Sequence, residues 1–192
     1  MLSDIKEWVA AHLEALPFAI REHVLRVRAI ALDLAQPHGV DREQVWLAVS
    51  AHDMARGLDD SALLDRARQL GLDIGPVERA VPILLHGPIA AEMLKLQGLN
   101  DSLAYDAVYW HSTGRQGMSV LEKVVFMADK LDPYKADRYQ DISEMRELSR
   151  HDLDAALLLF LENEMARLLR EGMVVHPAML AARNDLRLRK PA

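Results

Sequence analysis

The sequence predicts an all-α fold built as a helical bundle. Apolar residues recur at helical spacing along most of the 192 residues, and no segment shows the clear alternation of a half-buried strand. N-capping residues and prolines divide the chain into segments of helical length. We expect one domain over residues 1–192, with a core at about 18–135 and C-terminal helices at 137–190.

The first part of the chain is predicted to contain three helices. The first follows Ser3 and stops before Pro17, because proline interrupts a helix. The second covers about 20–35. The third begins after Asp41, an N-capping residue that has Gln44 at the capping-box position.

Shorter helices are predicted in the middle of the chain. One follows Asp59 and another follows Asp101, since both residues are suited to N-capping. Between them, Pro82 and Pro88 interrupt the helical pattern, so we expect His86 close to a helix boundary.

The strongest helix is predicted to open at Ser119, which has Glu122 at the capping-box position, and to end at Pro133. The first segment after it is polar and is expected to form a helix on the surface. Helical periodicity continues over residues 137–150, 152–170 and 177–190.

Composition and charge exclude several classes of function. The net charge of −6 argues against nucleic-acid binding by a generic basic surface. The chain contains no cysteine, which excludes disulfides, thiolate nucleophiles and Cys-ligated zinc. The N-terminus lacks a secretory pattern, and the longest purely apolar stretch is too short to cross a bilayer. We therefore expect a cytoplasmic protein without a membrane partner.

Six residues that can bind metal ions are spread along the predicted helices. A single histidine on an apolar helix face is more often a hydrogen-bonded core residue, but Asp53 and Asp129 also follow apolar runs. A buried carboxylate is costly unless it is paired or holds a metal. Because an aspartate can bridge two ions, the set predicts a two-metal centre that directs hydroxide at a phosphate. The six are His23, His52, Asp53, His86, His111 and Asp129. We assign surface, turn or capping roles to His12, His38, His151 and His176.

The order of these six residues resembles the signature of the HD-domain metal-dependent phosphohydrolases, and the inserted His86 and His111 resemble the subset with two metals. Further segments are similar to the YqeK-like family of symmetrical bis(5'-nucleosyl)-tetraphosphatases, and the match spans nearly the whole chain. These segments are Leu84–Pro88, Trp110–Gly114, Met118–Asp129 and His176–Asn184.

The resemblance implies an all-helical HD-domain fold and the cleavage of diadenosine tetraphosphate into two ADP. It also implies two divalent or trivalent metal ions, with iron expected and manganese, cobalt or zinc as alternatives that imidazole and carboxylate ligands also suit. A hydroxide shared by the ions would be the nucleophile. Carried over residue by residue, one ion would be held by His23, His52, Asp53 and Asp129, and the other by His86, His111 and a bridging Asp53.

Cations must hold the phosphates that the metals do not bind, although a solvated surface charge is the alternative for each candidate. The candidates are Arg56, Arg115, Lys123, Lys135 and Arg138. Lys123 is also a candidate catalytic residue, beside Asp53. The loop residues Ser112, Thr113 and Gly114 could donate hydrogen bonds to phosphate, although an ordinary turn explains them equally well. Arg183 and Asn184 could close one side of the pocket or cap the last helix.

Three positions depart from the family pattern. Arg56 stands where the family usually has lysine, while Asp132 and Lys135 stand where glutamate and arginine are expected. Arginine keeps a charge but does not give up a proton, and lysine lacks the bidentate fork of arginine. The departures leave the metal ligands intact and concern the phosphate-binding details.

Other functions are compatible with the same residues. Another HD hydrolase, acting on a nucleoside monophosphate, a cyclic nucleotide or guanosine tetraphosphate, would share the fold and the metals. A di-iron HD oxygenase would use a similar ligand set. A non-catalytic module is expected to lose ligands, and all six are present. The expected partner is a dinucleoside polyphosphate, and the helices after Asp137 could support a homodimer.

Overall fold

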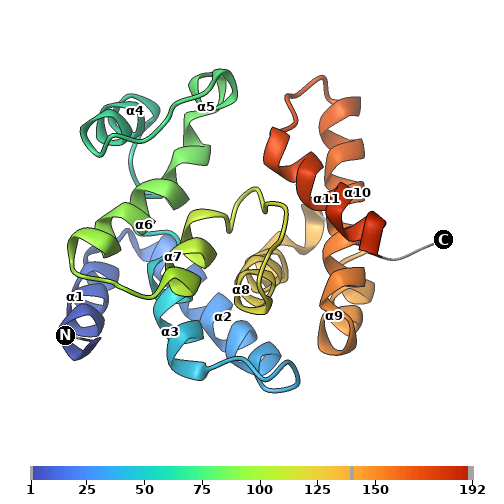
Figure 1. Cartoon of the computed structure of the whole chain (residues 1–192), viewed down its shortest axis with the longest axis horizontal. Helices are drawn as coiled ribbons and strands as arrows, with labels where there is room; N and C mark the ends of the chain where they lie inside the picture. The colour runs from blue at the N-terminus through green and yellow to red at the C-terminus, as the bar shows by residue number, and fades with distance from the viewer. Residues whose placement is uncertain (1, 139–140, 190–192) are drawn as a thin grey trace.

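The computed structural model describes residues 2–138 and 141–189, and within these ranges it consists of helices and loops without a strand (Figure 1). The predicted all-α fold is confirmed. None of the described helices is long and apolar enough to cross a membrane. The α-helices are α1 (Leu2–Ala15), α2 (Phe18–Ala35), α3 (Arg42–Ala51), α4 (Asp60–Gln69), α5 (Pro76–Ala80), α6 (His86–Leu96), α7 (Ser102–Tyr109), α8 (Val120–Lys130), α9 (Ile142–His151), α10 (Leu153–Arg170) and α11 (Pro177–Arg189). The 3-10 helices are η1 (Pro82–Leu85) and η2 (Pro133–Arg138).

The predicted capping residues set the starts of several helices. Asp41 accepts hydrogen bonds from the backbone N–H groups of Glu43 and Gln44, and Asp59 and Asp101 cap α4 and α7 in the same way. The prediction that Gln44 completes a capping box at α3 is wrong. The Gln44 side chain instead donates to Asp101 at 2.7 Å, and so ties α3 to the start of α7.

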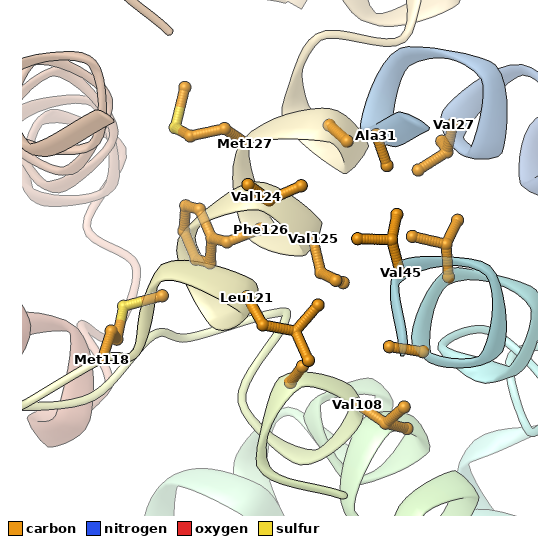
Figure 2. Close-up of a cluster of buried hydrophobic side chains, with 14 of the residues drawn as sticks. Val27, Ala31, Val45, Val108, Met118, Leu121, Val124, Val125, Phe126 and Met127 are labelled. Carbon is orange, nitrogen blue, oxygen red and sulfur yellow. The ribbon is translucent and has the colours of Figure 1, made fainter. Parts of the chain in front are cut away.

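Helix α8 is the centre of the molecule. Its capping box forms as predicted, with Ser119 and Glu122 each bonded to the backbone of the other. Every residue from Leu121 to Lys130 is buried, because α8 packs against α2, α3, α7 and α10. Figure 2 shows Leu121, Val124 and Val125 among apolar side chains that these neighbours contribute, including Val27, Ala31, Val45 and Val108.

Two of the predicted metal ligands lie just beyond helix ends, whereas the sequence placed them on the helices. Helix α3 ends at Ala51, so His52 lies in the turn that follows it, and α7 ends two residues before His111. His86 is the first residue of α6, at the helix boundary that the prolines predicted. The carbonyl groups in the last turn of a helix lack a backbone partner. An imidazole N–H placed after the turn can therefore bond to one of them.

The helix predicted over residues 137–150 differs from the structure in position and burial. The described helix α9 begins at Ile142, and η2 ends at Arg138; residues 139 and 140 of the predicted helix lie outside the described ranges. Ile142, Met145 and Ser149 are buried because α9 packs against α10, so this helix is amphipathic rather than polar. Lys190, the predicted end of the last helix, also lies outside the described ranges.

The close approach of α6 to the turn after α7 requires glycine at position 87. A Cβ atom there would lie 2.9 Å from the carbonyl oxygen of Tyr109 and 3.0 Å from the Cε1 and Nδ1 atoms of His111. The first distance is too short for a carbon atom, and the second is tighter than most real Cβ contacts. Gly87 therefore allows His86 and His111 to approach each other.

We predict that Gly87→Ala lowers the free energy of unfolding by about 1–3 kcal/mol, because overpacking displaces the backbone and the imidazole ring. Urea denaturation measures the change. Gly57→Ala is the matched control, since a Cβ there would meet its neighbours at an ordinary 3.6 Å. Equal stability of the two variants would show that the contact at position 87 relaxes at no cost.

Candidate metal centre

The structure brings the six predicted metal ligands together around the carboxylate of Asp53. One oxygen, Oδ2, lies 3.6 Å from Nε2 of His23 and 3.6 Å from Nε2 of His52. The other, Oδ1, lies 3.0 Å from Nε2 of His86 and 3.6 Å from Nε2 of His111. Asp53 therefore stands between two pairs of imidazoles, with one oxygen toward each pair. Asp129 joins the first pair, with Oδ1 2.9 Å from Nε2 of His23.

Local hydrogen bonds fix the proton on three of the four rings. His52 Nδ1 lies 2.6 Å from the carbonyl oxygen of Val49, and His111 Nδ1 lies 2.8 Å from that of Val108. His86 Nδ1 contacts the carbonyl oxygen of Ile83 in the same way. A carbonyl oxygen can only accept, so each Nδ1 carries the proton and each Nε2 presents a lone pair to the centre.

The described side chains leave one of these lone pairs without a partner. His52 is fully buried, and its Nε2 atom has no hydrogen-bond partner among the described residues. A buried polar atom of this kind costs about 1–3 kcal/mol. In addition, the Nε2 atoms of His86 and His111 face each other at 2.9 Å, although both are acceptors. A donor set of imidazole lone pairs and carboxylates fits a divalent cation, which would satisfy all of them.

Electrostatics hold most of the ligands in the forms that bind metals. The exception is His23: burial would lower its pKa, but the hydrogen bond and the charge of Asp129 outweigh burial and raise that pKa. Burial lowers the pKa of His52, and it lowers the pKa of His111 to about 3, so both rings are neutral at ordinary pH. Burial by itself would raise the pKa of Asp129, but the charges of Lys130 and Lys135 outweigh it and hold that pKa well below its ordinary value. Neutral imidazoles and ionised carboxylates are the forms that coordinate a metal.

Asp132 orients the fourth histidine, a role that the sequence did not reveal. Its Oδ2 atom accepts the Nδ1 proton of His23 at 2.5 Å, so this ring also turns Nε2 toward the centre. Arg26 binds both oxygens of Asp132, at 2.9 and 3.0 Å, and stacks over the ring of Tyr134. Asp132 is 1% exposed. A buried acid three residues after Asp129 is the signal that could have indicated this role.

A cavity of about 270 Å³ opens beside the centre and is lined by several of the predicted substrate-binding residues. Arg56, Ser112, Thr113 and Lys135 line it, as do the ligands His86 and Asp129. Lys130 also lines it, and the sequence did not single out this residue. Its Nζ atom donates to Asp129 at 2.7 Å and to the carbonyl oxygen of His111 at 3.2 Å.

Two predicted phosphate-binding cations are instead paired with carboxylates. Arg115 binds Glu122 through Nε at 2.6 Å and Asp106 through Nη2 at 3.0 Å. Lys123 pairs with Asp154 at 2.5 Å. Neither cation lines the cavity, so these contacts give both residues a structural role. The predicted catalytic role of Lys123 has no support in this geometry.

The other predicted contacts whose side chains the structure describes do not line this cavity. Gly114 adopts a positive φ of 66° in the turn after α7, which glycine favours. Arg183 binds Glu162 on α10, and Asn184 accepts a hydrogen bond from Arg183. The side chain of Arg138 lies outside the part of the chain that the structure describes.

The chain is similar to known proteins over most of its length. The family model named HD domain matches residues 20–134 of this chain. The chain is 30% identical over 168 residues to the symmetrical bis(5'-nucleosyl)-tetraphosphatase of Halalkalibacterium halodurans, covering 87% of this chain and 88% of that protein. It is 29% identical over 156 residues to the protein of the same name from Bacillus subtilis, covering 81% and 82%.

A solved structure shows the same fold. The crystal structure of a predicted HD superfamily hydrolase involved in NAD metabolism, from Clostridium acetobutylicum, has a TM-score of 0.89 to this chain at 28% identity. The similarity covers 96% of this chain and 98% of that one. Together, the HD domain and the clustered histidines and aspartates indicate divalent metal binding. The chain belongs to the HD-domain family and, within it, to the family of the symmetrical bis(5'-nucleosyl)-tetraphosphatases.

Proposed function

We propose that this protein hydrolyses diadenosine tetraphosphate symmetrically into two ADP at a two-metal centre. The observation that carries the proposal is the position of Asp53, whose two carboxylate oxygens face two different pairs of histidines. A carboxylate in this position can bridge two ions. The relatives named symmetrical bis(5'-nucleosyl)-tetraphosphatase supply the substrate and the point of cleavage.

The distances to the two oxygens of Asp53 group the ligands into two sets, although His52 also lies with Asp53 and His111 in a group whose ligand atoms are within 4.8 Å of one another. Oδ2 of Asp53 belongs with His23, His52 and Asp129, which form a group whose ligand atoms lie within 4.8 Å of one another. Oδ1 belongs with His86 and His111. This division supports the two ligand sets that the resemblance implied. We expect iron in both positions, and a ligand set of this kind also suits manganese, cobalt or zinc.

The reaction consumes one water molecule. The water oxygen bonds to one of the two central phosphorus atoms, the central P–O–P bridge breaks at that phosphorus, and each half departs as ADP. Two bound metal ions would lower the pKa of that water and would neutralise negative charge on the phosphoryl oxygens. Asp53 and Asp129 would carry the negative charge that holds the ions, while the fixed Nδ1 protons keep four rings aimed inward.

The chain's own cations would hold the phosphates next to the cleaved bond. Lys130 and Lys135 both bond to Asp129, so their charges lie at the wall of the cavity nearest the centre. Arg56 lines the same cavity and is exposed. Ser112 Oγ lies 3.1 Å from Nε2 of His111 and 3.3 Å from Nε2 of His86, in position to bond a phosphate oxygen. We favour these residues over Arg115 and Lys123.

Two further expectations complete the proposal. We expect the protein to act in the cytoplasm, on the small-molecule substrate that the names of its relatives indicate. Assembly into a homodimer stays a prediction.

We predict that iron-reconstituted protein converts diadenosine tetraphosphate into ADP alone, and that Asp53→Ala lowers kcat/KM on the order of 10³-fold. The loss follows because removal of the bridge weakens both metal positions. Ion-exchange chromatography resolves the products. Asp65→Ala, at a surface carboxylate paired with Arg68, is the matched control and should retain full activity. AMP plus ATP would refute the point of attack, and an active Asp53→Ala variant would refute the metal centre.

We also predict that Asp132→Ala weakens metal binding by about 10- to 100-fold, because His23 loses the acceptor that orients its ring. Competition with a chelator of known affinity measures the change. Asp132→Glu is the conservative comparison and should bind metal nearly as well as the unchanged protein, since it restores the carboxylate. Equal metal affinity in all three proteins would show that Asp132 serves only to pair with Arg26.

A further inference from the structure

The cavity beside the metal centre has two chemically different ends. Toward the metal ligands it is lined by the cations Arg56, Lys130 and Lys135. The rest of its lining is mostly apolar, but it also includes the paired side chains of Glu164 and Arg167, the imidazole of His176 and the ring of Phe160. The apolar side chains are Val81, Ile83, Leu84, Leu168, Met173, Val174 and Met179.

Two segments far apart in the sequence build the apolar end. One is η1 with the residue before it, and the other is the loop that joins α10 to α11 together with the adjoining turns of both helices (Figure 1). Met173 is 46% exposed and Val174 is 49% exposed, although both are large apolar residues. Val81, Ile83 and Leu84 are only half-buried. Exposed apolar surface that gathers in a cavity, with a few polar groups beside it, is typical of a ligand site.

A histidine ties the α10–α11 loop to α5, the helix that precedes η1. His176 Nε2 donates to Glu78 Oε1 at 2.8 Å, and its Nδ1 accepts the backbone N–H of Ala178 at 3.1 Å, at the start of α11. The ring is thus bonded through both nitrogens. It holds the α10–α11 loop against α5, and so fixes the width of the apolar end.

The charges of the cavity determine which part of a nucleotide can lie at each end. Glu164 lines the apolar end, and Arg167 binds its carboxylate through Nε and Nη2, both at 2.8 Å. Arg167 also lines the cavity, but it is paired with both Glu164 and Glu171, so this end attracts phosphate less than the opposite end, which offers three cations and the metal ligands. A nucleotide in this cavity is therefore oriented with its phosphates toward Asp129 and its base toward Val174.

We propose that the apolar end is the nucleoside subsite, where aliphatic and thioether side chains hold the base of one half of the dinucleotide. This inference rests on the proposed function, since the phosphate end is assigned by it. A volume of about 270 Å³ lies near the lower limit of ligand pockets, of about 300 Å³. The cavity therefore encloses one nucleoside half, and the second half extends out of it.

Calorimetry of product binding tests the subsite without relying on turnover. The double variant Met173→Ser with Val174→Ser removes apolar contacts without adding charge. We expect it to weaken ADP binding to the metal-loaded protein by about tenfold, and to leave the affinity for pyrophosphate unchanged because pyrophosphate has no base. The matched control is Leu169→Ser with Leu180→Ser, at two exposed leucines that do not line the cavity, and it should bind both ligands normally.

The outcomes separate this inference from the proposed function. Unchanged ADP affinity in the Met173/Val174 variant, or an equal loss for ADP and pyrophosphate, would overturn the nucleoside subsite. A failure of the unaltered protein to cleave diadenosine tetraphosphate would instead overturn the proposed function. Thermal unfolding of both double variants checks that they fold, and folding is expected because all four side chains are exposed.

Discussion

Three histidines of the metal centre donate their Nδ1 proton to a carbonyl oxygen three residues earlier, and the geometry of the centre depends on this local bond. The bond fixes the direction of each ring and leaves Nε2 as a lone pair. It is available because each histidine follows a helical turn, where carbonyl groups lack the usual helical partner, and the Ile83 carbonyl, which also accepts the backbone N–H of His86, has a second lone pair for the ring. The ends of α3, η1 and α7 therefore each aim one ligand at Asp53.

The same site places a negative and a positive side chain next to each other on α8, a deeply buried helix. Asp129 and Lys130 are both buried on α8, among apolar residues such as Phe126, whose ring lies 4.6 Å from the Lys130 Nζ atom. Burying an ion pair contributes little net stability, because desolvation offsets the attraction. We explain its presence by the proposed function, in which Asp129 would supply a metal ligand and Lys130 a charge at the cavity wall. Burial of the apolar side chains shown in Figure 2 stabilises the fold and offsets the desolvation cost of this ion pair.

The sequence predicted those features that short-range patterns encode. Capping by Asp41, Asp59, Asp101 and Ser119 depends on residues within one turn, and the structure contains each of these caps. The exact ends of α3 and α7 were missed, because helical propensity continues through Trp110 and past Ala51. The partners of Arg115 and Lys123 could not be predicted, since Asp106 and Asp154 are brought to them by tertiary packing. The apolar end of the cavity combines segments about ninety residues apart, so no local pattern reveals it.

The central claim is that Asp53 bridges two metal positions. Anomalous diffraction at the iron edge, from crystals of the iron-loaded protein, tests it most directly. Two peaks are predicted, one on the Oδ2 side of Asp53 next to His23 and His52, and one on the Oδ1 side next to His86 and His111. A single peak, or two peaks of which one does not contact Asp53, would contradict the claim.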